Sequence, residues 1–333
     1  MTPSPGANLV DWTLETSVVG SFTRIGYVVR RRLFDWAPLQ LLRLHDKVAI
    51  VTGATSGLGR AAAESIAMLG GHLCIVGRDP ARTERVCSEI STATGSVVEA
   101  DLADLSSLAE TAAFASRFAE RHDRLDVLVL NAGALTRAYT VTEEGNELTF
   151  ATHVLSPFLL IRALRRLLEA AAPSRVIVVA SGGMYTEPLD VDALDPEPAA
   201  YDGTKTYARC KRAQVMLVEE WTRELLDTGI TANAMHPGWA DTPGLRTALP
   251  GFSRFVGPLL RTPEEGADTI LWLAAAPDVA SLSGLFFLDR RPRAKHRLRR
   301  TRRPDEAREA ARLWRVCMER TAPFAAGSGG SVA

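Results

Sequence analysis

Seven short apolar runs alternate with longer segments of helical periodicity between residues 46 and 289 of this 333-residue chain. Most runs are continuously apolar, without the polar alternation of a strand that has one face in water, which indicates strands covered on both faces. Alternating strands and helices favour right-handed crossovers, so we predict an α/β fold in which a doubly wound parallel sheet lies between two layers of helices. The predicted strands are Val48–Thr52, His72–Val76, Val97–Val98, Asp126–Leu130, Arg175–Ala180, Ile230–Ala234 and Leu285–Leu288.

The same patterns divide the chain into three parts. Residues 46–289 form the predicted α/β domain, and residues 1–45 form a helical leader that precedes it. Residues 290–333 begin with a basic stretch, continue as a helix over 304–320 with Leu313 and Cys317 on one side, and end in a Gly/Ser tail that we expect to be disordered.

The leader has two interpretations. Val18, Phe22, Ile25 and Val29 follow helical spacing ahead of the arginines 30–32. An apolar face with a basic end is typical of a helix that lies on a membrane surface. The alternative, which we favour, is a helix whose apolar face packs on the domain or on a partner chain.

Charge argues against nucleic acid as a partner. The chain has 39 basic and 39 acidic residues, so a net positive charge is absent. Residues 290–303 contain nine Lys or Arg, but aromatic interleaving and binding-module motifs are lacking there. We expect a solvated loop, with contact to anionic lipid as the alternative.

Cysteine usage indicates a reducing compartment. The four cysteines are far apart and form no CxxC pair, so neither a disulfide framework nor a metal site is expected. No run of eighteen apolar residues and no secretory signal pattern occurs. We therefore expect a cytoplasmic protein, with membrane association through the leader as an open alternative.

A glycine-rich turn, Thr52-Gly-Ala-Thr-Ser-Gly-Leu-Gly59, directly follows the first predicted strand and opens a helix. In that context glycines allow a tight turn, and backbone N–H groups can approach a pyrophosphate at the positive end of the helix. We expect this turn to hold a dinucleotide through Gly53, Thr55, Ser56, Gly57, Leu58 and Gly59.

The end of the second strand bears on cofactor preference. A site that prefers NAD usually places a carboxylate there for the ribose hydroxyls, but here Gly77 is followed by Arg78. A guanidinium suits a 2′-phosphate, so we expect NADP(H) to be favoured over NAD(H). The alternative is that Arg78 merely caps the sheet edge.

Two further strand ends are candidates for cofactor contact. Asp101 and Leu102 follow the third strand, where a carboxylate could meet the adenine amino group. Asn131, Ala132 and Gly133 end the fourth strand, where small residues would let the cofactor pass closely.

Tyr207 and Lys211 are four residues apart in a helical segment, which places them on one face. A free tyrosine has a pKa of ~10, and a nearby ammonium is expected to lower that pKa and make the tyrosine an acid/base. Ser181, at the end of the fifth strand, could donate a hydrogen bond to a substrate oxygen. Tyr201 and Lys205 repeat the spacing, but Gly203 favours a loop there, so we favour Tyr207 and Lys211.

Together these motifs, in this order, resemble those of the short-chain dehydrogenase/reductase family over about residues 46–289. The stretches Ser181-Gly-Gly-Met-Tyr185 and His236-Pro-Gly-Trp-Ala-Asp-Thr-Pro243 are similar to the branch of dehydrogenase/reductase SDR family member 12, which neighbours the retinol-dehydrogenase-like enzymes. The resemblance implies a single-domain Rossmann fold with Ser181, Tyr207 and Lys211 as catalytic residues. It also implies contacts to the nicotinamide end from Pro237, Gly238 and Thr242.

One position departs from the family pattern. His153 stands where members usually have an Asn whose backbone carbonyl holds a relay water. The carbonyl survives the substitution, and an imidazole could also titrate near neutral pH. Whether His153 takes part in catalysis or only packs against the next helix stays open.

We therefore expect an oxidoreductase that transfers a hydride between NADP(H) and an alcohol or carbonyl. The alternative is a cofactor-binding sensor or scaffold with little catalysis, since fold alone does not fix function. The substrate is expected to be a small lipophilic molecule, and a homodimer is conceivable. The apolar residues expected to form a lid over the substrate are Trp239, Leu245, Leu249, Phe252, Phe255 and Val256.

Overall fold

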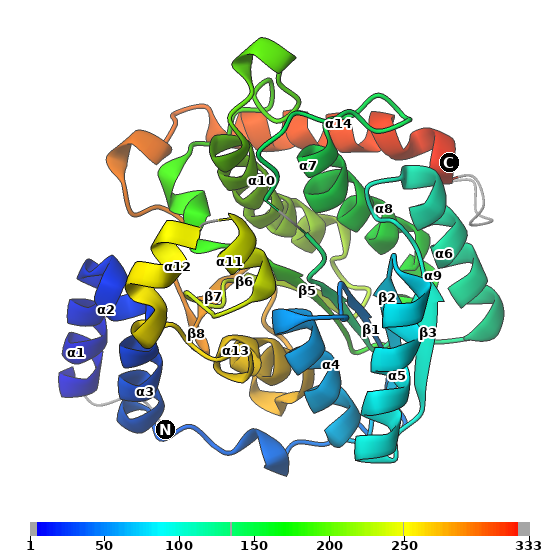
Figure 1. Ribbon diagram of the computed structural model, residues 1–333, viewed down its shortest axis with the longest axis horizontal. Coiled ribbons are helices and arrows are strands. Elements are labelled where there is room, and N and C mark those ends of the chain that lie inside the picture. The colour runs from blue at the N-terminus through cyan, green and yellow to red at the C-terminus, as the bar shows by residue number, and fades with distance from the viewer. Residues whose placement is uncertain (1–4, 134, 249, 326–333) are drawn as a thin grey trace.

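The computed structural model describes residues 5–133, 135–248 and 250–325, which form one sheet between layers of helices (Figure 1). The strand order is β3-β2-β1-β4-β5-β6-β7-β8. All neighbours pair in parallel except β7 and β8. The strands are β1 (Val48–Thr52), β2 (His72–Gly77), β3 (Val98–Leu102), β4 (Val127–Leu130), β5 (Ser174–Val179), β6 (Ile230–Met235), β7 (Phe286–Leu288) and β8 (Arg291–Pro292).

The predicted doubly wound sheet is confirmed. All seven predicted runs became strands, with ends shifted by a few residues. Only β8 went unpredicted, because its two residues are polar or proline and carry no hydrophobic pattern.

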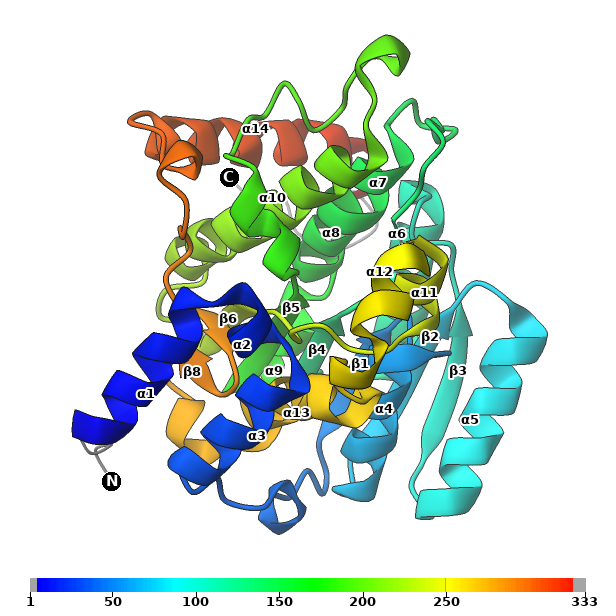
Figure 2. The same ribbon diagram turned by 60° about the vertical axis from the view of Figure 1, so that its left-hand side comes forward.

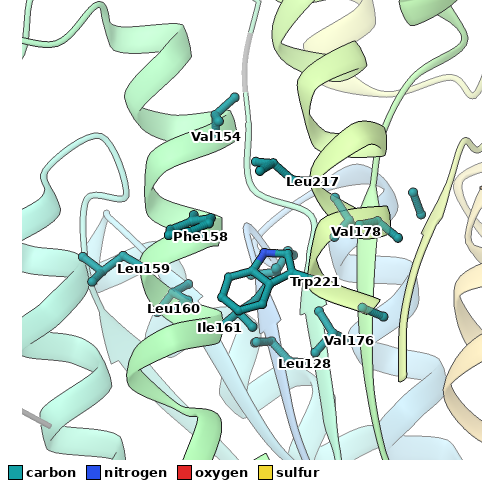
Figure 3. Close-up of a cluster of buried hydrophobic side chains, with 14 of the residues drawn as sticks. Leu128, Val154, Phe158, Leu159, Leu160, Ile161, Val176, Val178, Leu217 and Trp221 are labelled. Carbon is teal, nitrogen blue, oxygen red and sulfur yellow. The ribbon is translucent and has the colours of Figure 1, made fainter. Parts of the chain in front are cut away.

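Two hydrophobic clusters hold helices on opposite faces of the sheet. Phe118, Phe158 and Trp221 represent the cluster beneath α6, α8 and α10, and part of it is drawn in Figure 3. Ile66 and Ile270 represent the other, beneath α4, α5 and α13. The helices of the domain are α4 (Gly57–Met68), α5 (Pro80–Thr94), α6 (Leu108–Arg121), α7 (Leu148–Phe150), α8 (Ser156–Ala163), α9 (Arg165–Ala170), α10 (Gly203–Glu224), α11 (Pro243–Ala248), α12 (Pro250–Val256) and α13 (Pro263–Ala275).

The leader packs along the β8 side of the sheet (Figure 2). It forms α1 (Pro5–Thr16), α2 (Val18–Phe22) and α3 (Arg24–Leu33) rather than one continuous helix, with breaks at Ser17 and Thr23. Phe22 is buried in the domain, whereas Val18 and Ile25 on the same predicted face are about half exposed. The leader therefore packs its central aromatic residue, Phe22, on the domain.

A buried ion network fixes the leader in place. Arg30, predicted as part of a basic edge, is fully buried and donates to Asp289 after β7 (2.6 Å) and to Asp11 of α1 (2.7 Å). Asp289 also binds Arg261 with both carboxylate oxygens. Burial by itself raises the pKa of Asp289, but Arg261 and Arg30 outweigh it and hold the pKa below its usual value.

Part of the basic stretch is paired rather than solvated, whereas Arg299, Arg300 and Arg302 further along it are exposed as expected of a solvated loop. Arg290 pairs with Asp268 at 2.6 Å, Arg293 pairs with Asp11 at 2.8 Å, and Lys295 pairs with Glu219 at 2.8 Å. These cations cancel acidic groups of the leader and the domain, and such pairing cannot be recognised from a run of like charges.

The terminal helix α14 (Glu306–Ala325) extends the predicted 304–320 by about one turn. Leu313 and Cys317 are fully buried, and Trp314 packs edge-on against Trp221 of α10. The predicted disordered tail from 326 onward lies outside the described residues. Among the residues that the structure describes, no helix combines the length and hydropathy needed to cross a bilayer.

Candidate active site at the carboxyl edge of the sheet

The strands β1, β4, β5 and β6 end at one edge of the sheet, where the predicted site residues gather. The chain reverses its winding between β1 and β4, which are neighbours in the sheet. The helices that follow these two strands diverge to opposite faces. In α/β sheets a ligand-binding crevice lies above the strand ends at such a point. This is where α/β proteins bind their ligands.

The glycine turn has the features of an anion cradle. Gly57 has φ +54°, a left-handed conformation that favours glycine, and it opens the twelve-residue α4. A Cβ at Gly59 would collide with the carbonyl oxygen of Gly53, so the helix can lie this close to the strand only with glycine there. Ser56 at the N-cap makes no side-chain cap bond, so the first-turn N–H groups face outward without a side-chain acceptor. A pyrophosphate fits this arrangement.

Asn131 holds the turn against β4. Its side chain donates to the carbonyl oxygens of Thr52 and Gly53, at 3.0 and 3.3 Å. The backbone N–H groups of Asn131 and Ala132 donate to the Thr52 hydroxyl, at 2.9 and 3.0 Å. The side chain of Asn131 therefore supports the cradle from beneath.

The end of β2 offers no carboxylate toward a ribose. A Cβ at Gly77 would collide with the Thr83 hydroxyl and approach the Thr55 methyl at 2.9 Å, so only glycine fits. Arg78, the next residue, is exposed. Asp79 is committed to capping α5 through Arg82 N–H.

Asp101 is buried and holds two arginines at the end of β3. Its carboxylate accepts from Arg117 at 2.8 Å and from Arg121 at 2.6 Å. Burial alone raises the pKa of Asp101, but these two partners hold it below its usual value. Contact of Asp101 and the neighbouring Leu102 with adenine stays a prediction, in which the adenine amino group would share the carboxylate with two guanidinium groups.

The structure brings Ser181 at the end of β5 together with Tyr207 and Lys211 of α10. Ser181 and the Tyr207 hydroxyl hydrogen-bond, and Ser181 Oγ also accepts from Gly183 N–H at 3.2 Å. The Lys211 ammonium lies 5.6 Å from the centre of the Tyr207 ring and donates to the carbonyl of Val179 at 2.8 Å. A hydroxyl donor, a phenol and an amine thus share one small site.

The electrostatics of the ligand-free site differ from the expectation. Burial raises the pKa of Tyr207, and the hydrogen bond from Ser181 offsets only part of this rise. Burial lowers the pKa of Lys211 to about 7, so near neutral pH this amine is only partly charged. Desolvation is the largest cause of both shifts, and neither group has a carboxylate or guanidinium partner among its described contacts.

His153 lies beside Tyr207 in a π-helical turn, Ala151–Leu155, between α7 and α8. The two rings meet edge-on at 5.3 Å, and a Cβ at Gly133 would collide with the imidazole. The His153 carbonyl, the atom expected to hold a relay water, accepts from Gln214 Nε2 at 2.7 Å. Gln214 was missed, although its position seven residues after Tyr207 puts it on the same face of α10.

The rival pair lies outside this group. Tyr201 precedes α10, and its hydroxyl bonds Thr136 Oγ1 at 2.8 Å. Lys205 is exposed and lies 3.9 Å from Asp202. The geometry brings Tyr207, rather than Tyr201, to Ser181.

The loop after β6 closes the other side of the crevice. Thr242 lies beside the glycine turn, where a Cβ on Gly57 would be 3.2 Å from it. The backbone after Pro237 and Gly238 is bonded to the leader, since Trp239 N–H donates to the Phe22 carbonyl at 2.7 Å.

The leader contributes an aromatic ring that sequence reasoning did not place here. The centre of the Phe22 ring lies 4.5 Å from that of His236 and 5.8 Å from that of Trp239. A Cβ on Gly182 would collide with the Phe22 ring. Trp239 also meets Phe252 of the predicted lid at 4.8 Å. Leu249 of the predicted lid lies outside the described residues.

Known proteins share both the sequence and the fold. The family profile described as short chain dehydrogenase matches residues 47–250. Dehydrogenase/reductase SDR family member 12 of Bos taurus is 40% identical over 278 residues, 83% of this chain and 86% of that protein. Retinol dehydrogenase 14 of Mus musculus is 35% identical over 74% of this chain and 78% of its own length.

One solved structure is also informative about the cofactor. A candidate NAD(P)-dependent gluconate 5-dehydrogenase from Beutenbergia cavernae, with NADP bound at low occupancy, superposes with a TM-score of 0.62. It is 27% identical and covers 75% of this chain and 96% of its own.

The lowered pKa of Lys211 predicts a pH-dependent stability difference. Because the folded pKa of about 7 lies below the ordinary lysine pKa of 10.5, burying this lysine costs stability fully below about pH 7. That cost disappears as the pH rises toward the unfolded-state pKa. Urea unfolding should therefore show wild type gaining stability relative to Lys211→Met between about pH 7 and pH 10.

Lys205→Met, which removes an exposed lysine, should give a nearly constant difference from wild type in the free energy of unfolding. A constant difference for Lys211→Met as well would contradict the assignment.

Proposed function

The chain belongs to the short-chain dehydrogenase/reductase family and is an NAD(P)-dependent oxidoreductase, and on that basis we propose that it transfers a hydride between NADP(H) and a hydrophobic alcohol or carbonyl. The observation that carries the proposal is the convergence of Ser181, Tyr207 and Lys211 at the crevice beside the glycine turn. A sensor or scaffold would not require these three groups together.

Tyr207, Ser181 and Lys211 have separate roles in the proposed reaction. A bound nicotinamide cofactor would supply or accept the hydride. The Tyr207 hydroxyl gives a proton to the oxygen of a carbonyl substrate as negative charge develops there, or takes it from an alcohol in the reverse direction. Ser181 donates a hydrogen bond to the same oxygen and orients it. Lys211, anchored on the Val179 carbonyl, would hold the nicotinamide ribose and, when charged, would favour the ionised tyrosine.

His153 and Gln214 extend this group away from the substrate. The Gln214 amide fixes the His153 carbonyl, and the imidazole buttresses the Tyr207 ring from the side. We propose that they position Tyr207 and that the carbonyl is the end of the proton path to solvent. The imidazole has no step assigned to it.

The apolar wall of the crevice supports a lipophilic substrate. Phe22, Trp239 and Phe252 form a continuous chain of edge-on aromatic contacts at the loop after β6. A large apolar ligand would bury more surface there than a sugar could. The similarity to a protein named retinol dehydrogenase is consistent with such a substrate.

The first test separates catalysis from scaffolding. Tyr207→Phe removes the transferable proton and keeps the ring, so turnover of lipophilic aldehydes and ketones should fall by about 10²- to 10⁴-fold. NADPH affinity, measured by fluorescence titration, should stay within about twofold. Tyr201→Phe, the matched control, should keep nearly wild-type turnover. A wild-type protein that binds NADPH but reduces no member of the carbonyl panel would instead support the sensor.

Cofactor preference is tested at Arg78. Loss of a charge-assisted contact to the 2′-phosphate costs about 1.5–3 kcal/mol, or about one to two decades in affinity. Arg78→Ala should therefore weaken NADPH binding by that factor and leave NADH binding unchanged. Arg82→Ala, an exposed arginine one turn further along, should change neither. Equal wild-type affinities for NADPH and NADH in calorimetry would remove the basis for the preference.

Membrane contact through the leader is a separate proposal. Leu9 and Trp12 lie three residues apart on α1 and are about two-thirds exposed, with exposed Arg31 and Arg32 on α3. Truncating the leader would remove the buried Phe22 and Arg30, so point variants are the better probe. Full-length protein should float with anionic vesicles at low salt, and Leu9→Ser/Trp12→Ser should lower the floated fraction several-fold. Met68→Ser, an equally exposed apolar residue on α4, should not. Wild-type protein that remains unbound would eliminate this proposal.

A further inference from the structure

Two histidines and a glutamate meet at the amino edge of the sheet, on the side opposite the active site. His72 is the first residue of β2, Glu99 is the second residue of β3, and His122 caps the C-terminus of α6. These three elements are adjacent in Figure 1. His72 and Glu99 are 27 residues apart in sequence, and Glu99 and His122 are 23 residues apart, so no short sequence motif indicates the cluster.

The three side chains converge on one point. Glu99 Oε1 lies 2.6 Å from His72 Nε2, and Glu99 Oε2 lies 3.2 Å from His122 Nε2. One donor atom from each residue lies within 4.8 Å of the others. In a tetrahedral zinc site with ligands at about 2.0–2.1 Å, donor atoms are about 3.3–3.4 Å apart. A metal ion at the centre therefore requires side-chain adjustments of only about an ångström.

We propose that His72, Glu99 and His122 form a zinc site with three protein ligands and one open position. Two imidazoles with one carboxylate are a ligand set that Zn²⁺ accepts, and three protein ligands leave the fourth position for water. That position has access to solvent, because His72 and His122 line a surface hollow of about 890 Å³. This proposal departs from the sequence-based expectation of no metal site, which rested on cysteine spacing.

The surroundings order the ligands and offset the nearby positive charge. The His122 ring stacks on Phe118 at 4.2 Å, which limits its rotation. Arg121 Nε lies 3.8 Å from Glu99 and would repel a cation, but its Nη2 is drawn to Asp101 at 2.6 Å. Arg124, which lines the hollow, is paired with Asp126 at 2.7 Å, and Asp123 lines the same hollow.

A metal here would join β2, β3 and α6 at their amino-edge side. Binding free energy of an ion that prefers the folded chain adds directly to stability. The site is remote from Ser181 and Tyr207, so we expect zinc to stabilise the fold rather than to take part in hydride transfer. The proposal does not depend on the proposed function, because its test requires no turnover.

The experiment uses full-length, tag-free protein that has been dialysed against a chelator. Titration with ZnCl₂ in a calorimeter should show one Zn²⁺ per chain, and the melting temperature should rise with zinc. Co²⁺ as a probe should give the intense visible absorption of a four-coordinate site. Glu99→Gln, which keeps a hydrogen-bonding side chain of the same size, should weaken zinc binding by more than about 100-fold, since losing even an outer-shell partner typically costs 10- to 100-fold.

Matched controls and a second ligand variant separate this site from adventitious binding. His122→Gln should weaken binding as Glu99→Gln does. Glu120→Gln changes an acid that lines the same hollow, and His45→Asn changes an exposed histidine elsewhere; both should bind zinc as wild type does. No stoichiometric binding, the weak spectrum of six-coordinate Co²⁺, or binding that survives Glu99→Gln would each overturn the proposal.

Discussion

The parallel pairing of β1 with β4 is the constraint on which the site depends. Because these strands are neighbours while their following segments leave toward opposite faces, the chain cannot cover the crevice above them. The glycine turn after β1 and Ser181 after β5 therefore open on the same space. The side-chain bonds of Asn131 to Thr52 and Gly53 lock the turn to β4, and so the cradle inherits the rigidity of the sheet.

The second determinant is the buried carboxylate of Asp289. It binds Arg30 from the leader and Arg261 from the segment before α13, and Arg261 in turn donates to the carbonyls of Phe22 and Pro237. Removing one member of such a buried pair typically costs about 3–5 kcal/mol, because an uncompensated charge remains. The network therefore couples the leader to the substrate side of the crevice, and Phe22 becomes part of its wall.

The two edges of the sheet have different chemistry. The carboxyl edge gathers a hydroxyl, a phenol and a desolvated amine, and burial raises the pKa of the phenol while it lowers the pKa of the amine. The amino edge gathers two imidazoles and a carboxylate beside a solvent-accessible hollow. Strands β2 and β3 connect the edges, since they begin at the imidazole cluster and end at Arg78 and Asp101.

The sequence by itself determined the doubly wound parallel sheet, the glycine turn and the placement of Tyr207 and Lys211 on one helix face. Each of these rests on local periodicity or on spacing along one element. Tertiary structure decided what depends on residues far apart in the chain. Composition predicts a solvated loop at 290–303, but the fold places Asp268, Asp11 and Glu219 beside three of its cations. The direction of the Tyr207 and Lys211 pKa shifts likewise followed from desolvation, and burial is a property of the folded neighbourhood that no spacing of residues encodes.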